Sequence, residues 1–119
     1  PNQNIEVLAH VALDDFGAGG RQGADCWGYV SPSGREYALM CLTDGFSFVE
    51  VTDPIEVEIV ATFSGPSSTW RDIKTVGEYA YGISEASVGL QVFDLSDIDN
   101  GNVTYVGAVT SGGSSSTHN

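Results

Sequence analysis

Short apolar runs alternate with turn-forming residues along most of the chain. The runs are rich in Val, Ile, Tyr and Phe, and the segments between them are rich in Gly, Pro, Asp and Ser. Runs of this length and composition predict β-strands joined by tight turns. They fall into two sets of four: 26–30, 37–42, 46–51 and 58–63, then 71–74, 79–81, 90–95 and 105–109. We therefore expect an all-β, antiparallel protein.

The two sets are copies of one unit. The segment Gly45–Asp53 is repeated as Gly89–Asp97, and all nine positions match by residue class. The flanking runs match as well, with Tyr37 corresponding to Tyr79. Four strands in about 40 to 45 residues is the size of one blade of a β-propeller. The repeat therefore predicts about two four-stranded blades.

The repeat also predicts how the rest of the chain is divided. Residues 5–13 resemble the fourth strand of each unit, so an unpaired outer strand is expected before the first unit. Repeat units bury their faces on their neighbours, and about three are needed for stability. A chain that starts at Pro1 with two blades is thus expected to be a trimmed fragment, or to be completed by other chains. The expected divisions are 1–13 (outer strand completing another blade), 14–25 (acidic Gly-rich loop), 26–65 (blade one), 66–110 (blade two) and 111–119 (linker and start of a third blade).

The charge balance restricts the partners. Four Lys and Arg residues stand against sixteen Asp and Glu residues, giving a net charge of -12. Nucleic acids and anionic membranes require basic surface, so neither is an expected partner. No apolar run reaches the roughly 18 residues of a membrane-spanning helix, so membrane insertion is not expected. High acidity with little Lys and much Ser, Thr, Asn and Gly is typical of secreted proteins.

Three motifs carry a family resemblance. Trp70–Ile73, Gly77–Tyr81 and Gly89–Ser96 resemble the LVIVD repeat, and residues 5–119 look like the N-terminal part of the choice-of-anchor B group of secreted or surface proteins. The resemblance implies a β-propeller outside a cell and implies no reaction. Units of this repeat often begin with His-Asp. Here those places hold Trp27-Gly28, Arg71-Asp72 and His118-Asn119.

The start of each first strand is the best candidate for a ligand-binding site, because first strands line the axis of a propeller. The candidate residues share polar or aromatic character: Trp27, Trp70, Arg71, Asp72 and His118. They could bind a polar ligand or a cation. Alternatively, the two tryptophans pack between blades and Asp72 caps a neighbouring loop.

Cys26 and Cys41 are the two cysteines. If Val30 and Tyr37 flank the first turn, antiparallel pairing places Cys26 opposite Cys41. Directly opposed residues lie within disulfide range. A disulfide and a pair of buried free thiols both fit this pattern.

Two further candidates rest on short patterns. Asp14, Asp15 and Asp25 offer hard oxygen ligands for calcium, but their spacing matches no calcium-loop motif, and a solvated loop fits as well. No other cofactor is expected. Asn102-Val103-Thr104 is a glycosylation sequon.

The recurring acids Glu50 and Asp94 lie within third strands, where we expect them to accept backbone hydrogen bonds. No nucleophile motif, phosphate-binding loop or metal-spaced His pair is present in the sequence. The favoured function is a non-catalytic extracellular module that binds or scaffolds a protein or a glycan, assisted by further blades. The alternatives are part of a secreted enzyme with its site at the propeller mouth, and a subunit of an extracellular fibre.

Overall fold

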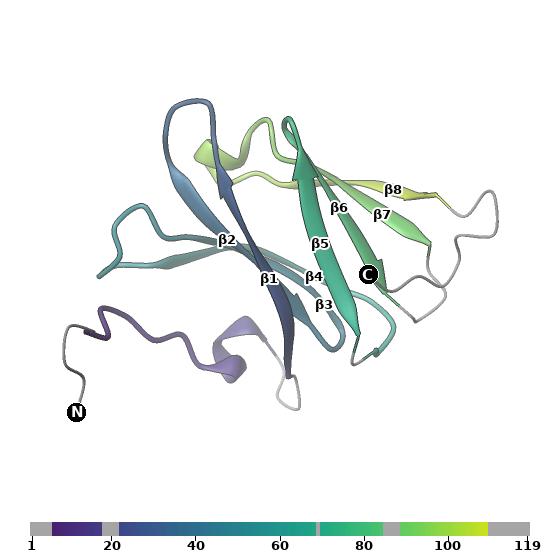
Figure 1. Cartoon of the computed structure of the whole chain (residues 1–119), viewed down its shortest axis with the longest axis horizontal. Helices are drawn as coiled ribbons and strands as arrows, with labels where there is room; N and C mark the ends of the chain where they lie inside the picture. The colour runs from purple at the N-terminus through teal and green to yellow at the C-terminus, as the bar shows by residue number, and fades with distance from the viewer. Residues whose placement is uncertain (1–5, 18–21, 69, 85–88, 110–119) are drawn as a thin grey trace.

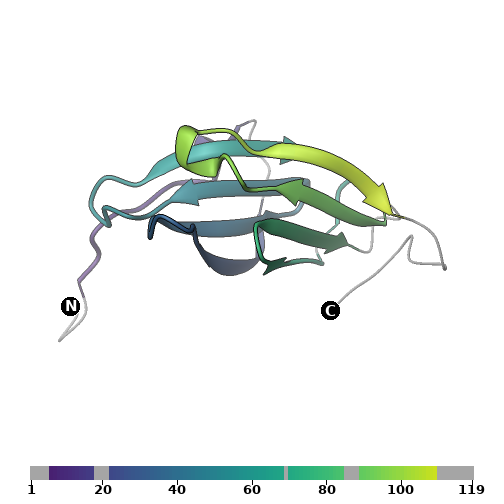
Figure 2. The same ribbon diagram turned by 90° about the horizontal axis from the view of Figure 1, so that it is seen from above.

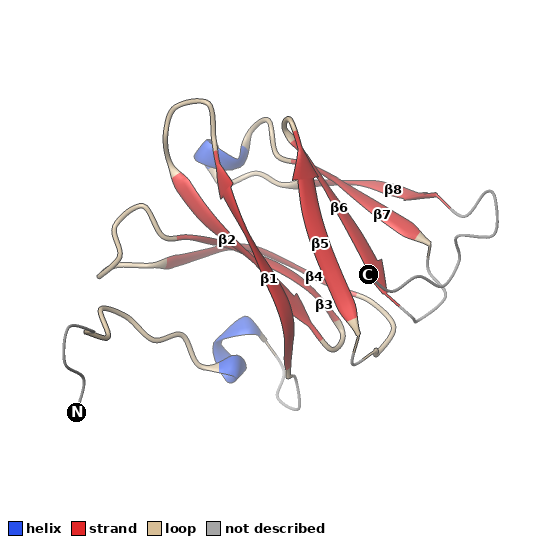
Figure 3. Cartoon of the chain, viewed as in Figure 1, coloured by secondary structure: helices blue, strands red, loops and turns tan. Residues whose placement is uncertain are grey.

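The computed structural model describes residues 6–17, 22–68, 70–84 and 89–109. These residues form two four-stranded antiparallel sheets, which confirms the all-β prediction (Figure 1 and Figure 3). In each sheet the strands follow chain order. The first sheet contains β1 (Gly23–Val30), β2 (Glu36–Leu42), β3 (Gly45–Glu50) and β4 (Glu58–Ser64). The second contains β5 (Arg71–Val76), β6 (Tyr79–Ser84), β7 (Leu90–Asp94) and β8 (Thr104–Val109).

The sheets pack face to face through alternate residues of their strands. On the first sheet, Leu39 and Phe48 point to the interface, because successive side chains of a strand face opposite ways. They meet Ile73, Ala80 and Phe93 of the second sheet. The ring of Phe93 lies 5.3 Å from that of Phe48, centroid to centroid. The largest buried cluster of the described residues therefore lies between the two repeated units.

The sheets also run in the same order across the molecule. Figure 2 shows β1 and β5 toward one edge and β4 and β8 toward the other. The contact between β1 and β5 brings the two first strands together. This is the arrangement that positions the candidate site.

At two positions only glycine fits, because other atoms lie too close for a Cβ. A Cβ on Gly45 would lie 1.9 Å from the backbone oxygen of Phe63 on β4. A Cβ on Gly82 would lie 2.6 Å from the ring tip of Phe46. Gly89, which matches Gly45 in the repeat, has a different requirement, because its φ is 78°. The repeated glycine thus serves close contact in one unit and a left-handed backbone in the other.

The predicted outer strand at residues 5–13 is wrong over the part that the structure describes. Residues 6–12 form no strand, and Leu13–Phe16 form a 3-10 helix, η1. A strand needs a hydrogen-bonding neighbour, and this segment instead lies beside the face of the first sheet that points away from the second (Figure 1). Phe16 is buried there against Leu42 and Val49. Of the predicted acidic loop 14–25, residues 14–16 lie in η1 and residues 23–25 in β1.

A second 3-10 helix, η2 (Ile98–Asn100), connects β7 to β8. It matters for the site because it reaches the first sheet. The predicted start of a third blade, residues 111–119, lies outside the described residues.

Candidate functional site

The first strands bring an aromatic ring and polar groups together at the sheet interface. Trp27 on β1 donates its indole N–H to the hydroxyl of Thr75 on β5 at 3.0 Å. The ammonium of Lys74 lies 4.5 Å from the centroid of the Trp27 ring, within cation–π range. Trp27 is still 39% exposed. The structure therefore places Trp27 at a junction between the sheets with part of its ring open to a partner.

Asp72 is buried beside this junction. Its carboxylate accepts hydrogen bonds from its neighbour's amide, Ile73 N, at 2.8 Å and from Lys74 Nζ at 3.0 Å. The side chain of Asp25 on β1 lies beside this carboxylate. Burial raises the pKa of Asp72, but the interactions with Asp25, Lys74 and Ile73 outweigh burial and leave that pKa below its ordinary value. The Asp72 carboxylate is thus a buried charge whose hydrogen bonds are used within the protein, and it is poorly placed to bind a ligand.

Arg71 points into the interface and not toward the surface. Only 3% of the residue is exposed, and its guanidinium lies 5.1 Å from the centroid of the Phe46 ring. Nη2 donates to the carbonyl of Pro66, whereas Nε and Nη1 have no hydrogen-bond partner among the described residues. Burial lowers the pKa of Arg71. Arg71 is therefore separated from the open surface that the sequence assigned to it.

Trp70 precedes β5 and is the most exposed of the four candidates that the structure describes, at 55%. Its amide N–H donates to the Ser68 hydroxyl at 3.2 Å, and that hydroxyl donates to the Trp70 carbonyl at 3.0 Å. These bonds fix the backbone and leave much of the indole uncovered. The last candidate, His118, lies outside the described residues.

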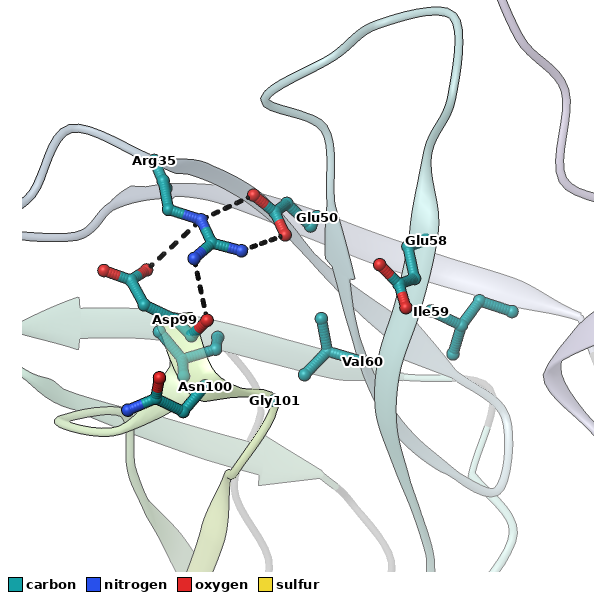
Figure 4. A pocket seen from close by; sticks show the side chains of 9 residues that line it. Arg35, Glu50, Glu58, Ile59, Val60, Asp99, Asn100 and Gly101 are labelled. Carbon is teal, nitrogen blue, oxygen red and sulfur yellow. Dashed lines mark hydrogen bonds and ion pairs between the residues drawn. The ribbon is translucent and has the colours of Figure 1, made fainter.

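A second polar group, not anticipated from the sequence, links the two sheets. Arg35, at the end of the first turn, makes two bonds to Glu50, Nε to Oε2 at 2.8 Å and Nη2 to Oε1 at 2.7 Å. Its Nη1 donates to the carbonyl of Asp99 in η2 at 2.7 Å. Figure 4 shows the guanidinium between Glu50 and Asp99. We call Ser31, Ser33, Arg35, Tyr37, Glu50 and Asp99 the latch.

The remaining members of the latch surround the Asp99 carboxylate. Tyr37 donates to Oδ1 at 2.6 Å, and Ser33 and Ser31 donate to Oδ2 at 2.6 Å and 3.1 Å. Hydrogen bonds from Ser33 and Tyr37 lower the pKa of Asp99, and those from Arg35 and Thr52 lower the pKa of Glu50. Burial and the bond to Asp99 raise the pKa of Tyr37. The latch thus favours charged acids and a neutral tyrosine.

Three residues of the latch, Arg35, Glu50 and Asp99, line a pocket of about 390 Å³ between the first sheet and η2. Glu58 faces Glu50 across neighbouring strands, and Ile59, Val60 and Ile98 supply apolar wall. Three carboxylates stand there against one guanidinium, so the pocket suits a small polar or cationic group better than an anion. One signal in the sequence could have pointed to the latch. Glu50 recurs as an acid in a strand, and the chain has only four Lys and Arg residues that could pair with it. Asp94, its counterpart, accepts a backbone bond from Ser96 at 2.8 Å, as expected.

Of the two arrangements that the sequence left open for the cysteines, the structure shows free thiols and no disulfide, but only one of the thiols is buried. Cys26 pairs with Met40 and not with Cys41, because the β1–β2 register is shifted by one residue from the expected one. A one-residue shift moves a side chain to the other face of the sheet. Both thiols are free; Cys26 is exposed and Cys41 buried. Burial raises the pKa of Cys41 to about 12.

The calcium candidates do not assemble. Asp15 accepts a bond from the amide of Ala12 within the η1 turn at 3.0 Å, whereas Asp25 lies on β1 beside Asp72. Across residues 6–17, 22–68, 70–84 and 89–109, no three His, Cys, Asp or Glu side chains are grouped to hold a metal. Asn102 is exposed, and its side-chain amide donates to Asp97 at 2.6 Å. The asparagine of the sequon is thus accessible, just before β8.

Comparison with known proteins adds no relative. No family model, curated protein or solved structure matches the chain. In the described part of the chain, none of the helices has the length and hydrophobicity needed to span a bilayer. The family resemblance drawn from the motifs therefore stays a prediction.

Proposed function

We propose that the chain is part of an extracellular β-propeller that binds or scaffolds a protein or a glycan at a cell surface. The observation that carries this proposal is the stacking of two repeated four-stranded sheets with β1 beside β5. Consecutive propeller blades have this order, with their first strands toward the axis. Further blades would come from the same protein or from other chains.

The exposed aromatic side chains support a binding role. Trp70 is more than half exposed just before β5, and Trp27 is partly exposed on β1. Aromatic residues are enriched where proteins contact partners, since they offer a large area with few rotatable bonds. The resemblance to secreted and surface proteins and the net charge of -12 favour a location outside the cell.

Binding to intact cells tests the proposed role. Fluorescently labelled chain is added to cells before and after enzymatic removal of surface glycans, and separately of surface proteins. We expect saturable binding that one treatment abolishes and that Trp70→Ser weakens. Val76→Ser is the matched control, because Val76 is another large apolar residue of the same sheet edge and is 71% exposed. Absence of saturable binding would contradict the proposal.

The architecture is tested by electron microscopy of the intact protein. We expect a ring of about four to eight sheets with β1 and β5 lining its axis. A structure in which these two sheets close on each other with no further sheet would reject the propeller.

A further inference from the structure

The first sheet has an outer face equivalent to the covered face of the second. In the second sheet, Ala80, Gly82 and Phe93 pack against the first sheet. Their counterparts in the repeat are Ala38, Met40 and Val49. Ala38, Met40 and Val49 belong to the cluster around Phe16, apart from the inter-sheet core, so they lie on the face that points away from the second sheet. The repeat itself therefore shows what kind of surface covers such a face: the aromatic and aliphatic face of another four-stranded unit.

Residues 9–16, which we call the cap, cover part of this outer face. Phe16 is only 7% exposed and packs with Leu42 and Val49, and Val11 packs against the same cluster. In the interface between the sheets, the counterpart of Val49 is Phe93, which meets the ring of Phe46 at 5.5 Å. Phe16 thus occupies the type of position that an aromatic residue of a preceding unit would fill.

The cap covers the face incompletely. A hollow of about 250 Å³ remains beneath it, lined by Val11, Phe16, Met40 and Val49 among others. Toward β1 the face is open, and a second hollow, of about 530 Å³, extends over Cys26, Gly28, Val30, Ala38 and Met40. The cap adds no strand to the sheet. Because no strand pairing holds the described residues of the cap, it can leave without breaking a ladder of backbone hydrogen bonds.

The complementary surface lies at the other end of the same molecule. On β6 and β7, Tyr79, Tyr81, Ile83, Leu90 and Val92 alternate with the residues that face the first sheet. They are the repeat counterparts of Tyr37, Leu39, Cys41, Phe46 and Phe48, which form the first sheet's half of the interface. One copy of the chain therefore carries both halves of a second interface of the kind already present between its sheets.

We propose that the cap blocks head-to-tail self-association, in which the outer face of β6–β7 of one copy docks on the outer face of the first sheet of another. Displacing the cap opens that site to a second copy of the chain. This inference depends on the repeat and on the packing of the two sheets, and it does not depend on the proposed binding role.

Charge repulsion and the geometry of the contact determine whether copies associate and how many copies an assembly contains. Each copy has a net charge of -12, so association is opposed by repulsion that salt weakens. The contact joins two different surfaces, and such contacts close into rings when the rotation between copies allows it. With two sheets per copy, a ring of about four to eight sheets would need about two to four copies.

The test compares the masses of four proteins in solution by light scattering at one concentration and about 0.15 M salt. The unchanged chain and Val7→Ser, an exposed change outside the cap, are expected at 12.5 kDa. Phe16→Ser is expected at a mass of about two to four copies. Phe16→Ser combined with Ile83→Asp, which places a charge on the opposing surface, is expected to return to one copy.

A second measurement separates assembly from misfolding. Cys26 lies on the outer face of the first sheet, so its alkylation should slow in the Phe16→Ser assembly and recover in the double variant. The inference is overturned if the unchanged chain is already oligomeric, if Phe16→Ser stays at one copy, or if Ile83→Asp leaves its association unchanged. Unfolding-driven aggregation would not respond to Ile83→Asp, and would also count against the inference.

Discussion

The hydroxyl of Tyr37 lies 2.6 Å from Oδ1 of Asp99, which joins β2 of the first sheet to η2 of the second. The two residues are 62 positions apart in the chain. Tyr37 is buried, and the carboxylate it contacts also accepts bonds from two serines of the first turn. The two sheets are thus held together by a polar contact as well as by their aromatic core.

Tyr37→Phe removes this bond and keeps the ring. We expect a loss of about 1.5 kcal/mol in the free energy of unfolding, because a hydrogen bond to a charged group is lost. Urea unfolding followed by tryptophan fluorescence measures it. Tyr79→Phe is the control, since Tyr79 is the repeat counterpart of Tyr37 and is exposed; it should change stability by less than about 0.5 kcal/mol. Equal effects of the two changes would show that the Asp99 contact contributes nothing.

The latch predicts a stability profile that falls at both pH extremes. The pKa values of Glu50 and Asp99 are lowered by folding, so their contribution is present above roughly pH 5 and is lost as the pH falls below roughly pH 4. The pKa of Tyr37 is raised by folding, so its contribution is present below roughly pH 10 and is lost above it.

The acid side of this profile is checked by measuring the urea midpoint against pH. Asp99→Asn should lower stability at neutral pH and make its decline in acid shallower. Glu56→Gln, in an exposed loop, removes a charge of the same sign and should leave the decline unchanged. A profile of Asp99→Asn parallel to that of the unchanged chain would argue against the latch as its source.

Gly45→Ala should be among the most damaging single changes. The added methyl group would meet the backbone of β4, which cannot rotate away, so we expect a loss at or above the roughly 1–3 kcal/mol of ordinary overpacking. Gly28→Ala is the control on the same sheet, because nothing lies within 4 Å of the Cβ it adds. Thermal unfolding of both variants measures the difference, and similar midpoints would contradict the close approach.

The two thiols should react at very different rates. Cys26 is exposed and should be alkylated in the folded protein, whereas Cys41 is fully buried and has a pKa of about 12, so it should react only after unfolding. Mass spectrometry of samples alkylated with and without denaturant counts the modified residues. If no reductant is present and alkylation leaves the mass of the protein unchanged both with and without denaturant, the two cysteines form a disulfide instead.

The repeat made the strands predictable, because Gly45–Asp53 and Gly89–Asp97 present the same apolar pattern and the same turn residues. The register of the first hairpin could not be predicted so well. The turn is closed by Ser31 N to Arg35 O at 2.9 Å, so Glu36 joins the strand instead of the turn. That single residue moves the β1–β2 pairs from Cys26 to Val30 by one position and separates Cys26 from Cys41. Turn length is set by local hydrogen bonds that the apolar pattern does not encode.

The N-terminal segment and the latch were missed for different reasons. Residues 5–13 have strand-like composition, but composition does not reveal whether a neighbouring strand is available. Arg35 and Asp99 are 64 positions apart, and they meet only because the sheets stack. Of the predicted site residues, Trp27 contacts Lys74 and Thr75, which follow Asp72 on β5. Arg71, in contrast, is buried in the core. The sequence could rank residues by chemistry, but only packing decides which of them face a partner.

The contact of Phe46 with Gly82 has one more consequence. A bare backbone on one sheet accommodates a whole ring from the other, so the two positions share a fixed amount of space. Any lineage that gains a side chain at position 82 should therefore carry a smaller residue at position 46. The spacing between these sheets can therefore be kept through evolution only if positions 46 and 82 change together.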